Sequence, residues 1–321
     1  MEYKLLGETG IVVSRLGFGC WAIGGHGYGR QDDSNSIKAI KQALAQGITF
    51  FDTADVYGFG HSEEVLSKGL GSQRNKVVIA SKFGVSWDDN GRTYFDCRPE
   101  RIIKALEDSL QRLRVDCIPL YQIHWYDNVT PISDTLDILM KCKEQGKIRS
   151  IGCSNFSLSL LEKIVKKYPI EALQCSYNIC EREIETETLN YAREFGISII
   201  TYNVLARGLL SGKYDMTTVF GEADTRSKDR RFQGEKVKKY LKVLGVLRSL
   251  SKNYNRNPSQ IAIRWVLQNP DITTVLVGIT NPEQIKENIE VFDWSLSEQD
   301  FQCLGIAEQR ALGNNISLST A

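Results

Sequence analysis

Residues 77–82 of the chain read VVIASK, and residues 197–202 read ISIITY. Both runs are short and almost continuously hydrophobic, and they lie between longer segments whose apolar residues recur at three- and four-residue steps. Strands that are buried on both faces have this pattern, and such strands occur mainly in parallel sheets. The two runs therefore predict a parallel sheet that is covered by helices.

The same alternation of short and long segments continues along all 321 residues. Eight apolar runs are predicted to be strands: residues 16–20, 49–52, 77–82, 118–124, 148–152, 172–175, 198–202 and 274–278. Amphipathic helices are predicted between them, among others at residues 34–46, 100–112, 132–144, 158–167, 185–195 and 258–268. Eight strand–helix units predict an α/β fold, a (β/α)8 TIM barrel that forms one domain over residues 1–321. Residues 3–5 and 12–14 predict an N-terminal β-hairpin about a turn at residues 7–10.

An open, doubly wound sheet is the alternative fold, and it would need a dinucleotide fingerprint after an early strand. The glycine-rich stretch GFGCWAIGGHGYGR, residues 17–30, does not have the G-x-G-x-x-G spacing followed by a helix and an acidic residue, so we interpret it as a mobile βα loop. The longest irregular segment, residues 214–234, is predicted to be a flap over a ligand, although its charged residues could equally be a solvated surface.

The composition excludes several classes of partner. Lys and Arg number 40 against 39 Asp and Glu, so the net charge of +1 predicts no nucleic-acid partner and no anionic membrane surface. The first residues, MEYKLLGETG, lack a secretory signal, and no run of about 18 apolar residues is present, which predicts a cytoplasmic protein. The eight cysteines show no C-x-x-C spacing, so we expect reduced, mostly buried thiols and no metal site.

Reactive groups in a parallel barrel gather at the carboxyl ends of the strands. Asp52, Lys82 and His124 end three successive predicted strands, and Tyr57 follows Asp52 in the stretch FDTADVYG. Burying either charge alone would be costly, so Asp52 and Lys82 are expected to pair. The ammonium group would then lower the pKa of the Tyr57 phenol, which could act as a general acid on a carbonyl oxygen while His124 donates a hydrogen bond to that oxygen.

Each of these residues also has a simpler interpretation, as a helix cap, a surface charge or a structural histidine. No H-E-x-x-H, P-loop or G-x-S-x-G motif offers other chemistry. The pattern alone leaves a glycosidase carboxylate pair open, but few acidic residues end the predicted strands. The joint placement of the four groups therefore favours carbonyl reduction.

Several stretches follow one another in a specific order: FDTADVYGFGHSEEVLSKGL, VVIASKFG, LYQIHW, GKIRSIGCSNFS, LQCSYN and YNVLARGLLSGKY. In this order and spacing they resemble the aldo-keto reductase superfamily, and the resemblance extends from GETGIVVSRLGFGCW to GITNPEQIKEN. It implies transfer of the pro-R hydride of a nicotinamide cofactor and a catalytic tetrad of Asp52, Tyr57, Lys82 and His124.

The resemblance also implies where the cofactor lies. Ser154, Asn155 and Gln174 would hold the nicotinamide carboxamide, and Tyr177 or a neighbour would stack on the ring. The pyrophosphate would lie along residues 202–212, and the adenosine end near residues 278–288. The implied contact residues are Trp21, Asp52, Tyr202, Asn203, Leu205, Gly208, Leu210, Lys213, Gly278, Thr280, Gln284 and Asn288. Without the resemblance, Ser154 and Asn155 could form a helix N-cap, and Gln284 and Asn288 an exposed helix face.

Two departures from the family pattern affect the cofactor site. Asn203 and Val204 stand where relatives often have Ser-Pro, and Thr280 and Asn281 stand where many have a basic residue. Without that cation we predict NADP(H) to be preferred over NAD(H) by a modest margin, with Lys213 or Lys286 as partial compensation. The 214–234 insertion resembles the bacterial subgroup that includes inositol-associated reductases.

The sequence thus predicts a reversible, NAD(P)H-dependent reductase of small aldehydes or ketones, acting as a monomer or weak oligomer. Two alternatives stay open: a regulatory subunit like those of potassium channels, and a redox-neutral epimerase or isomerase that uses a bound cofactor. The substrate pocket is predicted to be walled by aromatic residues, each of which could instead be core: Trp21, Trp87 and Trp125, with Phe83 and Tyr126.

Overall fold

The computed structural model describes residues 1–25, 27, 29, 32–222 and 224–311, with side chains described as far as residue 307. Part of the predicted glycine-rich loop, at residues 26, 28, 30 and 31, and residue 223 of the predicted flap lie outside the described residues. No helix in the described part of the chain is long and apolar enough to cross a membrane.

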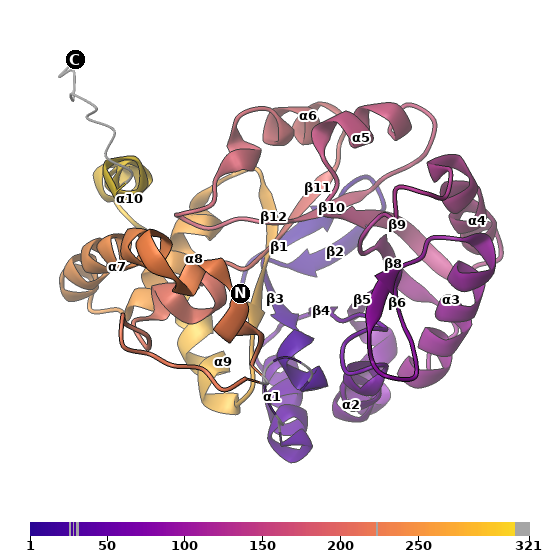
Figure 1. Cartoon of the computed structure of the whole chain (residues 1–321), viewed down its shortest axis with the longest axis horizontal. Coiled ribbons are helices and arrows are strands. Elements are labelled where there is room, and N and C mark those ends of the chain that lie inside the picture. The colour runs from indigo at the N-terminus through magenta and orange to yellow at the C-terminus, as the bar shows by residue number, and fades with distance from the viewer. Residues whose placement is uncertain (26, 28, 30–31, 223, 312–321) are drawn as a thin grey trace.

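The predicted TIM barrel is confirmed, since eight parallel strands close into a barrel in chain order (Figure 1). The strands are β3 (Leu16–Gly19), β4 (Phe50–Asp52), β5 (Val78–Phe83), β8 (Ile118–Ile123), β9 (Ile148–Ser154), β10 (Ala172–Ser176), β11 (Ser198–Tyr202) and β12 (Ile272–Gly278). Each overlaps a predicted strand, and the ends differ by one or two residues or coincide. Lys82 consequently lies inside β5 rather than at its end.

Helices surround the barrel (Figure 1). They are α1 (Asp33–Ala45), α2 (His61–Leu70), α3 (Pro99–Leu113), α4 (Ile132–Glu144), α5 (Leu158–Ile164), α6 (Thr188–Glu194), α7 (Gly234–Tyr254), α8 (Pro258–Gln268), α9 (Pro282–Ile289) and α10 (Glu298–Ala311). Short 3-10 turns include η1 (Trp21–Gly24), η4 (Ala206–Ser211), η5 (Thr225–Lys228) and η6 (Arg230–Phe232). The predicted helix at residues 185–195 begins later, at α6, because a separate 3-10 turn, η3 (Glu183–Glu185), precedes it.

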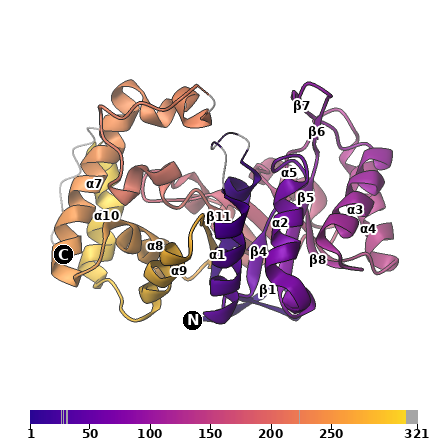
Figure 2. The ribbon, with the colours of Figure 1, turned by 90° about the horizontal axis from the view of Figure 1, so that it is seen from below.

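The N-terminal hairpin is also confirmed: β1 (Tyr3–Leu6) pairs with β2 (Ile11–Ser14). Leu6, Ile11 and Val13 of this hairpin are buried in one cluster with inward-facing barrel residues such as Phe50 and Leu120. The hairpin therefore closes the end of the barrel where the strands begin. Figure 2 shows it at the side opposite to a second hairpin, β6 (Val85–Trp87) and β7 (Thr93–Phe95).

The interior of the barrel changes from apolar to polar within one pleat of the strands. Side chains of a strand alternate between the two faces, so residues two positions apart point the same way. The apolar layer includes Phe50, Ala80, Leu120 and Ala172. Two residues further along the same strands, the next layer contains Asp52, Lys82, Gln122 and Gln174. Buried polar side chains therefore lie inside the barrel towards the carboxyl ends of the strands.

The β6–β7 hairpin was missed by the sequence analysis, although a local signal for it exists. Its turn contains Asn90 and Gly91, a pair that strongly favours hairpins, and Gly91 has a φ of 73°. The amide of Gly91 donates to the carbonyl oxygen of Asp88 at 2.9 Å. The hairpin forms part of the connection between β5 and α3, so it rises from the carboxyl end of the barrel.

Candidate active site

The buried polar layer is organised around one ion pair. The Lys82 ammonium donates to Asp52 Oδ1 at 2.6 Å, and neither side chain is more than 4% exposed. The other carboxylate oxygen of Asp52 accepts from the amide of Gln174 at 2.8 Å and from that of Gln122 at 3.3 Å. Taking two charges out of water is costly unless their hydrogen bonds are satisfied, and here both groups are well supplied. Gln122 was not singled out from the sequence.

Lys82 also points at the tyrosine. Its ammonium donates to the carbonyl oxygen of Thr53 at 2.8 Å and to the Tyr57 hydroxyl oxygen at 3.4 Å, and it lies 5.0 Å from the centre of the tyrosine ring. The three donor directions of the ammonium are thereby committed to Asp52, Thr53 and Tyr57. The structure therefore places Lys82 close to both Asp52 and Tyr57 at the mouth of the barrel, as the sequence predicts.

The catalytic loop, residues 53–60, is fixed by a close approach to η1. A Cβ added to Gly24 would lie 2.6 Å from the carbonyl carbon of Tyr57, and one added to Gly58 would lie 2.3 Å from the carbonyl oxygen of Gly24. Gly58 also has a φ of 62°, which suits glycine. Because glycine is required on both sides of this contact, the backbone of Tyr57 is held against the segment that follows β3.

His124 lies directly after β8 and faces the same tyrosine. Its ring meets that of Tyr57 edge to face, with centroids 5.6 Å apart and an angle of 82°. Burial, with a smaller contribution from the Lys82 charge, lowers the pKa of His124 well below its usual value of 6.5. The imidazole is therefore neutral near pH 7 and can donate a single N–H. Its Nδ1 atom is buried and has no hydrogen-bond partner in the part of the chain that the structure describes.

Asn155 connects this centre to the neighbouring strands. Its side-chain nitrogen donates to the carbonyl oxygen of His124 at 3.2 Å and to Ser154 Oγ at 3.0 Å, and its side-chain oxygen accepts from the Tyr202 hydroxyl at 2.7 Å. The alternative in which Ser154 and Asn155 cap a helix is wrong, because Ser157 is the N-cap of α5. Ser154, Asn155 and Gln174 are brought together beside Asp52, as the family resemblance implies.

Tyr177 does not lie where a ring-stacking residue would. It is fully buried, its hydroxyl donates to Glu185 at 2.5 Å, and its ring packs against Trp265 with centroids 5.5 Å apart. The chain turns inward after β10, which carries Tyr177 into the core behind the barrel. Tyr202, the last residue of β11, donates its hydroxyl to Asn155 and stands, like Tyr57, in the mouth of the barrel.

The backbone after β11 has an unusual conformation. Asn203, Ala206, Arg207 and Gly208 all have φ between 48° and 100°. A Cβ at Gly208 would lie 2.7 Å from the Tyr214 ring, so this glycine is needed where it stands. Asn203 donates to Ser176 and Glu181 at 3.1 and 3.0 Å, while its Oδ1 is buried and has no hydrogen-bond partner among the described residues. Of the remaining implied contacts here, Leu210 is buried, Leu205 is partly buried and Lys213 is exposed.

The implied adenosine end lies at β12 and α9. Gly278 is exposed, and no atom lies within 4 Å of the position where its Cβ would be. The side-chain oxygen of Gln284 accepts from the backbone amides of Thr280 and Asn281, at 2.8 and 3.3 Å. Asn288 is 6% exposed. The alternative of an exposed helix face is therefore wrong for Gln284 and Asn288.

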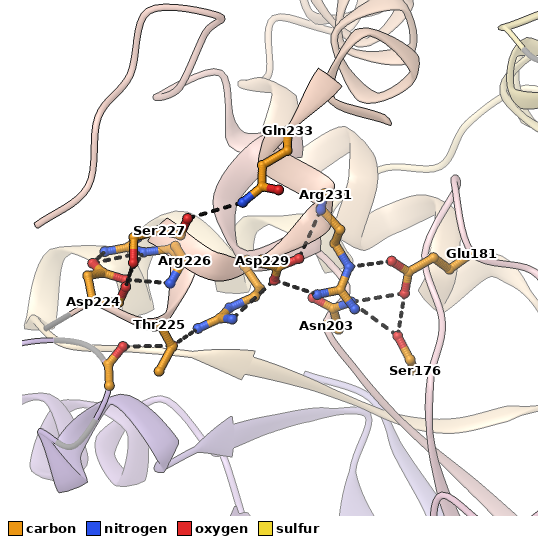
Figure 3. Close-up of polar contacts among 12 residues, drawn as sticks. Ser176, Glu181, Asn203, Asp224, Thr225, Arg226, Ser227, Asp229, Arg231 and Gln233 are labelled. Atoms are coloured by element: carbon orange, nitrogen blue, oxygen red, sulfur yellow. Dashed lines mark hydrogen bonds and ion pairs between the residues drawn. The ribbon is translucent and has the colours of Figure 1, made fainter. Parts of the chain in front are cut away.

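The flap, residues 214–234, is tied across the carboxyl end of the barrel by charged side chains (Figure 3). Asp229 accepts from Arg207 at 3.1 Å and from Arg231 at 2.8 Å, and Arg231 also donates to Glu181 at 2.6 Å. The amide of Thr225 donates to the carbonyl oxygen of Gly27 at 3.0 Å, which joins the flap to the segment after β3. The segment contains η5 and η6, so it is more ordered than the predicted irregular loop.

The predicted aromatic wall is only partly at the surface of the site. Trp21 is 40% exposed and its ring lies 6.4 Å from that of Tyr57, and Trp125 is 41% exposed and stacks on Phe95. Trp87 is partly buried and packs against Phe59 of the catalytic loop with centroids 5.3 Å apart. Phe83 is fully buried, so the core interpretation holds for it. Tyr126 is partly buried, and its hydroxyl donates to the carbonyl oxygen of Thr130.

The arrangement can protonate an oxygen at the barrel mouth, because Tyr57 presents a hydroxyl beside a buried cation and His124 a neutral imidazole. Within the described residues, no group of His, Cys, Asp or Glu side chains could hold a metal ion. Tyr57 and His124 themselves offer proton transfer and hydrogen bonding.

Comparison with known proteins shows which family the chain belongs to. The profile of the aldo/keto reductase family matches residues 15–307, so the chain belongs to that family. Its activity is the NAD(P)H-dependent reduction of carbonyl compounds. The proposed alternative of a regulatory subunit is thus set aside in favour of an enzyme.

Individual relatives are similar over nearly the whole chain. The chain is 39% identical over 303 residues to aldo-keto reductase YhdN of Bacillus subtilis, covering 94% of this chain and 91% of that one. It is 34% identical to an NADH-specific methylglyoxal reductase of Escherichia coli, covering 92% and 94%. Among solved structures, the glycerol dehydrogenase AKR11B4 from Gluconobacter oxydans superposes with a TM-score of 0.89 at 37% identity, covering 99% and 98% of the two chains.

Proposed function

We propose that Tyr57 is the general acid that protonates the oxygen of a small aldehyde or ketone in the barrel mouth. The observation that carries this proposal is the simultaneous donation of the Lys82 ammonium to Asp52 and to the Tyr57 hydroxyl, at 2.6 and 3.4 Å. A reduced nicotinamide, when bound, supplies the hydride, with the pro-R position expected from the family resemblance. As the hydride reaches the carbonyl carbon, the carbonyl oxygen gains negative charge and takes the Tyr57 proton.

The neighbours of Tyr57 have distinct parts in this proposal. Lys82 stabilises the phenolate that remains after proton transfer, because its positive charge is buried beside the hydroxyl. Asp52 holds that ammonium in place through their 2.6 Å contact. His124 stays neutral because burial depresses its pKa, so it orients the carbonyl oxygen as a hydrogen-bond donor and does not compete as an acid.

The residues present are suited to a nicotinamide dinucleotide. Ser154, Asn155 and Gln174 offer amide and hydroxyl groups beside Asp52, which suits a carboxamide. The buried side-chain oxygen of Asn203 has no partner within the described residues and can accept from a ligand N–H or O–H. The open space at Gly278 lets a ligand approach the backbone closely. We assign the carboxamide of the cofactor to Ser154, Asn155 and Gln174. The pyrophosphate is assigned to the position of Asn203 and the adenosine end to that of Gly278.

We propose that NADP(H) is preferred over NAD(H) by a modest margin. The amides of Thr280 and Asn281, which could receive a 2′-phosphate, already donate to Gln284, and Lys213 and Lys286 are both exposed. A hydrogen bond to a charged partner contributes about 1.5–3 kcal/mol against about 1 for a neutral one, so a missing arginine costs about tenfold in affinity. Relatives are named for either cofactor: the Escherichia coli protein is an NADH-specific methylglyoxal reductase, and the Schizosaccharomyces pombe protein is named with NADP(+).

Fluorescence titration with NADPH and NADH tests the cofactor proposal. Thr280→Arg should widen the NADPH preference by about tenfold, whereas Thr280→Met, a long side chain without charge, should not. A preference of about 10³ or more for NADPH in the unaltered chain would show that another cation binds the phosphate.

The function is tested by following NADPH and NADH absorbance with a panel of aldehydes, ketones and keto sugars. The panel includes inososes, because the 214–234 insertion resembles that of the subgroup that includes inositol-associated reductases. Cofactor consumption in step with carbonyl loss supports a reductase. Substrate conversion without cofactor consumption would support the epimerase instead.

We further propose that the chain acts in the cytosol as one domain, and as a monomer or weak oligomer. One continuous core cluster includes residues from Leu16 to Leu304, and six of the eight cysteines are buried. Sedimentation at micromolar concentration tests the assembly state, since a stable larger species would contradict it.

A further inference from the structure

A buried ionic contact lies directly beneath the catalytic loop and takes no part in the chemistry described above. Asp55, two residues before Tyr57, is fully buried, and its Oδ2 accepts from the Arg101 guanidinium at 2.7 Å. Its other carboxylate oxygen has no hydrogen-bond partner among the residues that the structure describes. Burial raises the pKa of Asp55 to about 7, and the Arg101 charge is the largest effect that opposes this rise. Arg101 is therefore the group that makes a charged Asp55 tolerable.

Arg101 has a second set of contacts, on the β6–β7 hairpin. Its Nε donates to Ser86 Oγ at 2.7 Å, and its guanidinium carbon lies 5.5 Å from the centre of the Trp87 ring. Arg101 comes from the first turn of α3 and its side chain is 17% exposed. One planar guanidinium thus joins the catalytic loop, the β6–β7 hairpin and helix α3 of the barrel wall.

The hairpin depends on such anchors. A two-stranded hairpin is marginal in isolation, and this one has three paired positions. Its β7 side is held by the stacking of Phe95 on Trp125. Its β6 side carries Trp87, which packs on Phe59 of the catalytic loop, a residue whose φ is 56°. Arg101 adds a second link, from this β6 side to the buried carboxylate of Asp55, two residues before Tyr57.

We propose that Arg101 is a positioning residue: by bridging Asp55 to Ser86 and Trp87, it fixes the aromatic wall against the catalytic loop and so selects for bulky carbonyl substrates. The inference rests on the proposed reductase function. We expect a small aldehyde to bind at Tyr57 without depending on the hairpin. A substrate with an aromatic ring needs the wall at a defined distance from the reacting oxygen, and small misplacements of such a contact reduce rates strongly.

The test compares Arg101→Gln with Arg98→Gln. Arg98 is a matched control because it lies three residues earlier, has a side chain that is 68% exposed, and pairs with Asp96. We expect Arg101→Gln to raise KM for 4-nitrobenzaldehyde by about tenfold, to leave KM for glyceraldehyde within about threefold, and to keep the cofactor Kd within about twofold. Arg98→Gln should change none of these. Arg101→Lys should be intermediate, because an ammonium cannot bridge Asp55 and Ser86 in the planar geometry of a guanidinium.

Two measurements keep the inference open to refutation if Arg101→Gln folds poorly. Ser86→Ala removes one arm of the bridge and should change the same KM ratio in the same direction by a smaller factor. Amide hydrogen exchange over residues 85–95 should likewise be faster in Ser86→Ala than in Arg98→Gln. Equal losses with both substrates, or unchanged exchange in the hairpin, would overturn the positioning role. An unaltered enzyme that consumes no cofactor would refute the proposed function instead, while the exchange measurement would still judge the bridge.

Discussion

Replacing Lys82 with methionine leaves the Asp52 carboxylate buried without its cation. Breaking one side of a buried ion pair typically costs about 3–5 kcal/mol. The lower end applies here, because Asp52 keeps its amide donors Gln174 and Gln122, at 2.8 and 3.3 Å. At about 2 °C per kcal/mol for a chain of this size, we expect a loss of about 6 °C in the thermal midpoint of unfolding.

Circular dichroism melting at neutral pH measures this loss against two further variants. Lys104→Met removes a lysine whose side chain is 72% exposed and pairs with Asp108, so it should shift the midpoint by about 1 °C or less. Asp52→Asn combined with Lys82→Met removes both charges and should recover at least half of the loss. A Lys82→Met protein that melts like Lys104→Met, or a double variant no better than the single one, would refute the coupling.

Two more expectations concern the loop that carries Tyr57. Gly24→Ala places a methyl group 2.6 Å from the Tyr57 carbonyl carbon, so turnover should fall by about 10²-fold, whereas Gly245→Ala, with no atom within 4 Å of its Cβ position, should be neutral; equal turnover of the two variants in a steady-state assay would be the contrary result. Asp55 has a folded pKa of about 7 against 3.8 for the free side chain, so the folded state binds more protons between these values. Stability from this group is complete below about pH 4 and is lost as pH rises through about 7, by about 1.4 kcal/mol per pH unit. Asp55→Asn lacks this pH-dependent contribution, so the melting midpoint of the variant should rise relative to that of the unaltered chain between pH 5 and pH 8. A difference between the two midpoints that does not change with pH would contradict the raised pKa of Asp55.

The fold was predictable because strand alternation is a local property of the sequence. Runs such as residues 77–82 are hydrophobic on both faces, and the polar residue that interrupts them marks the carboxyl end of the barrel. The same reasoning found Asp52 and His124, which end or follow strands, and Lys82, which lies one position inside β5. The alternation also explains why these groups share one layer above Phe50 and Leu120.

Other parts of the site depend on contacts between distant positions. Asp55 and Arg101 are 46 residues apart, and no local pattern connects them. Gln122 is an uncharged amide within an apolar strand, so only the barrel geometry reveals that it reaches Asp52. The family resemblance places Tyr177 or a neighbour on the cofactor ring, but the turn after β10 carries Tyr177 into the core against Trp265. The direction of a loop is decided by tertiary packing, which the sequence pattern does not contain.

We propose above all that Tyr57 donates the proton, while the other residues of the site bind and orient the cofactor and the carbonyl substrate. The most direct test is Tyr57→Phe, with single-turnover reduction of an aldehyde and cofactor affinity measured on the same preparation. General acid catalysis contributes about 10²- to 10⁴-fold, so we expect the rate of cofactor oxidation to fall within that range while the cofactor Kd stays within about twofold. A Tyr57→Phe protein that reduces the aldehyde at nearly the unaltered rate would contradict the account.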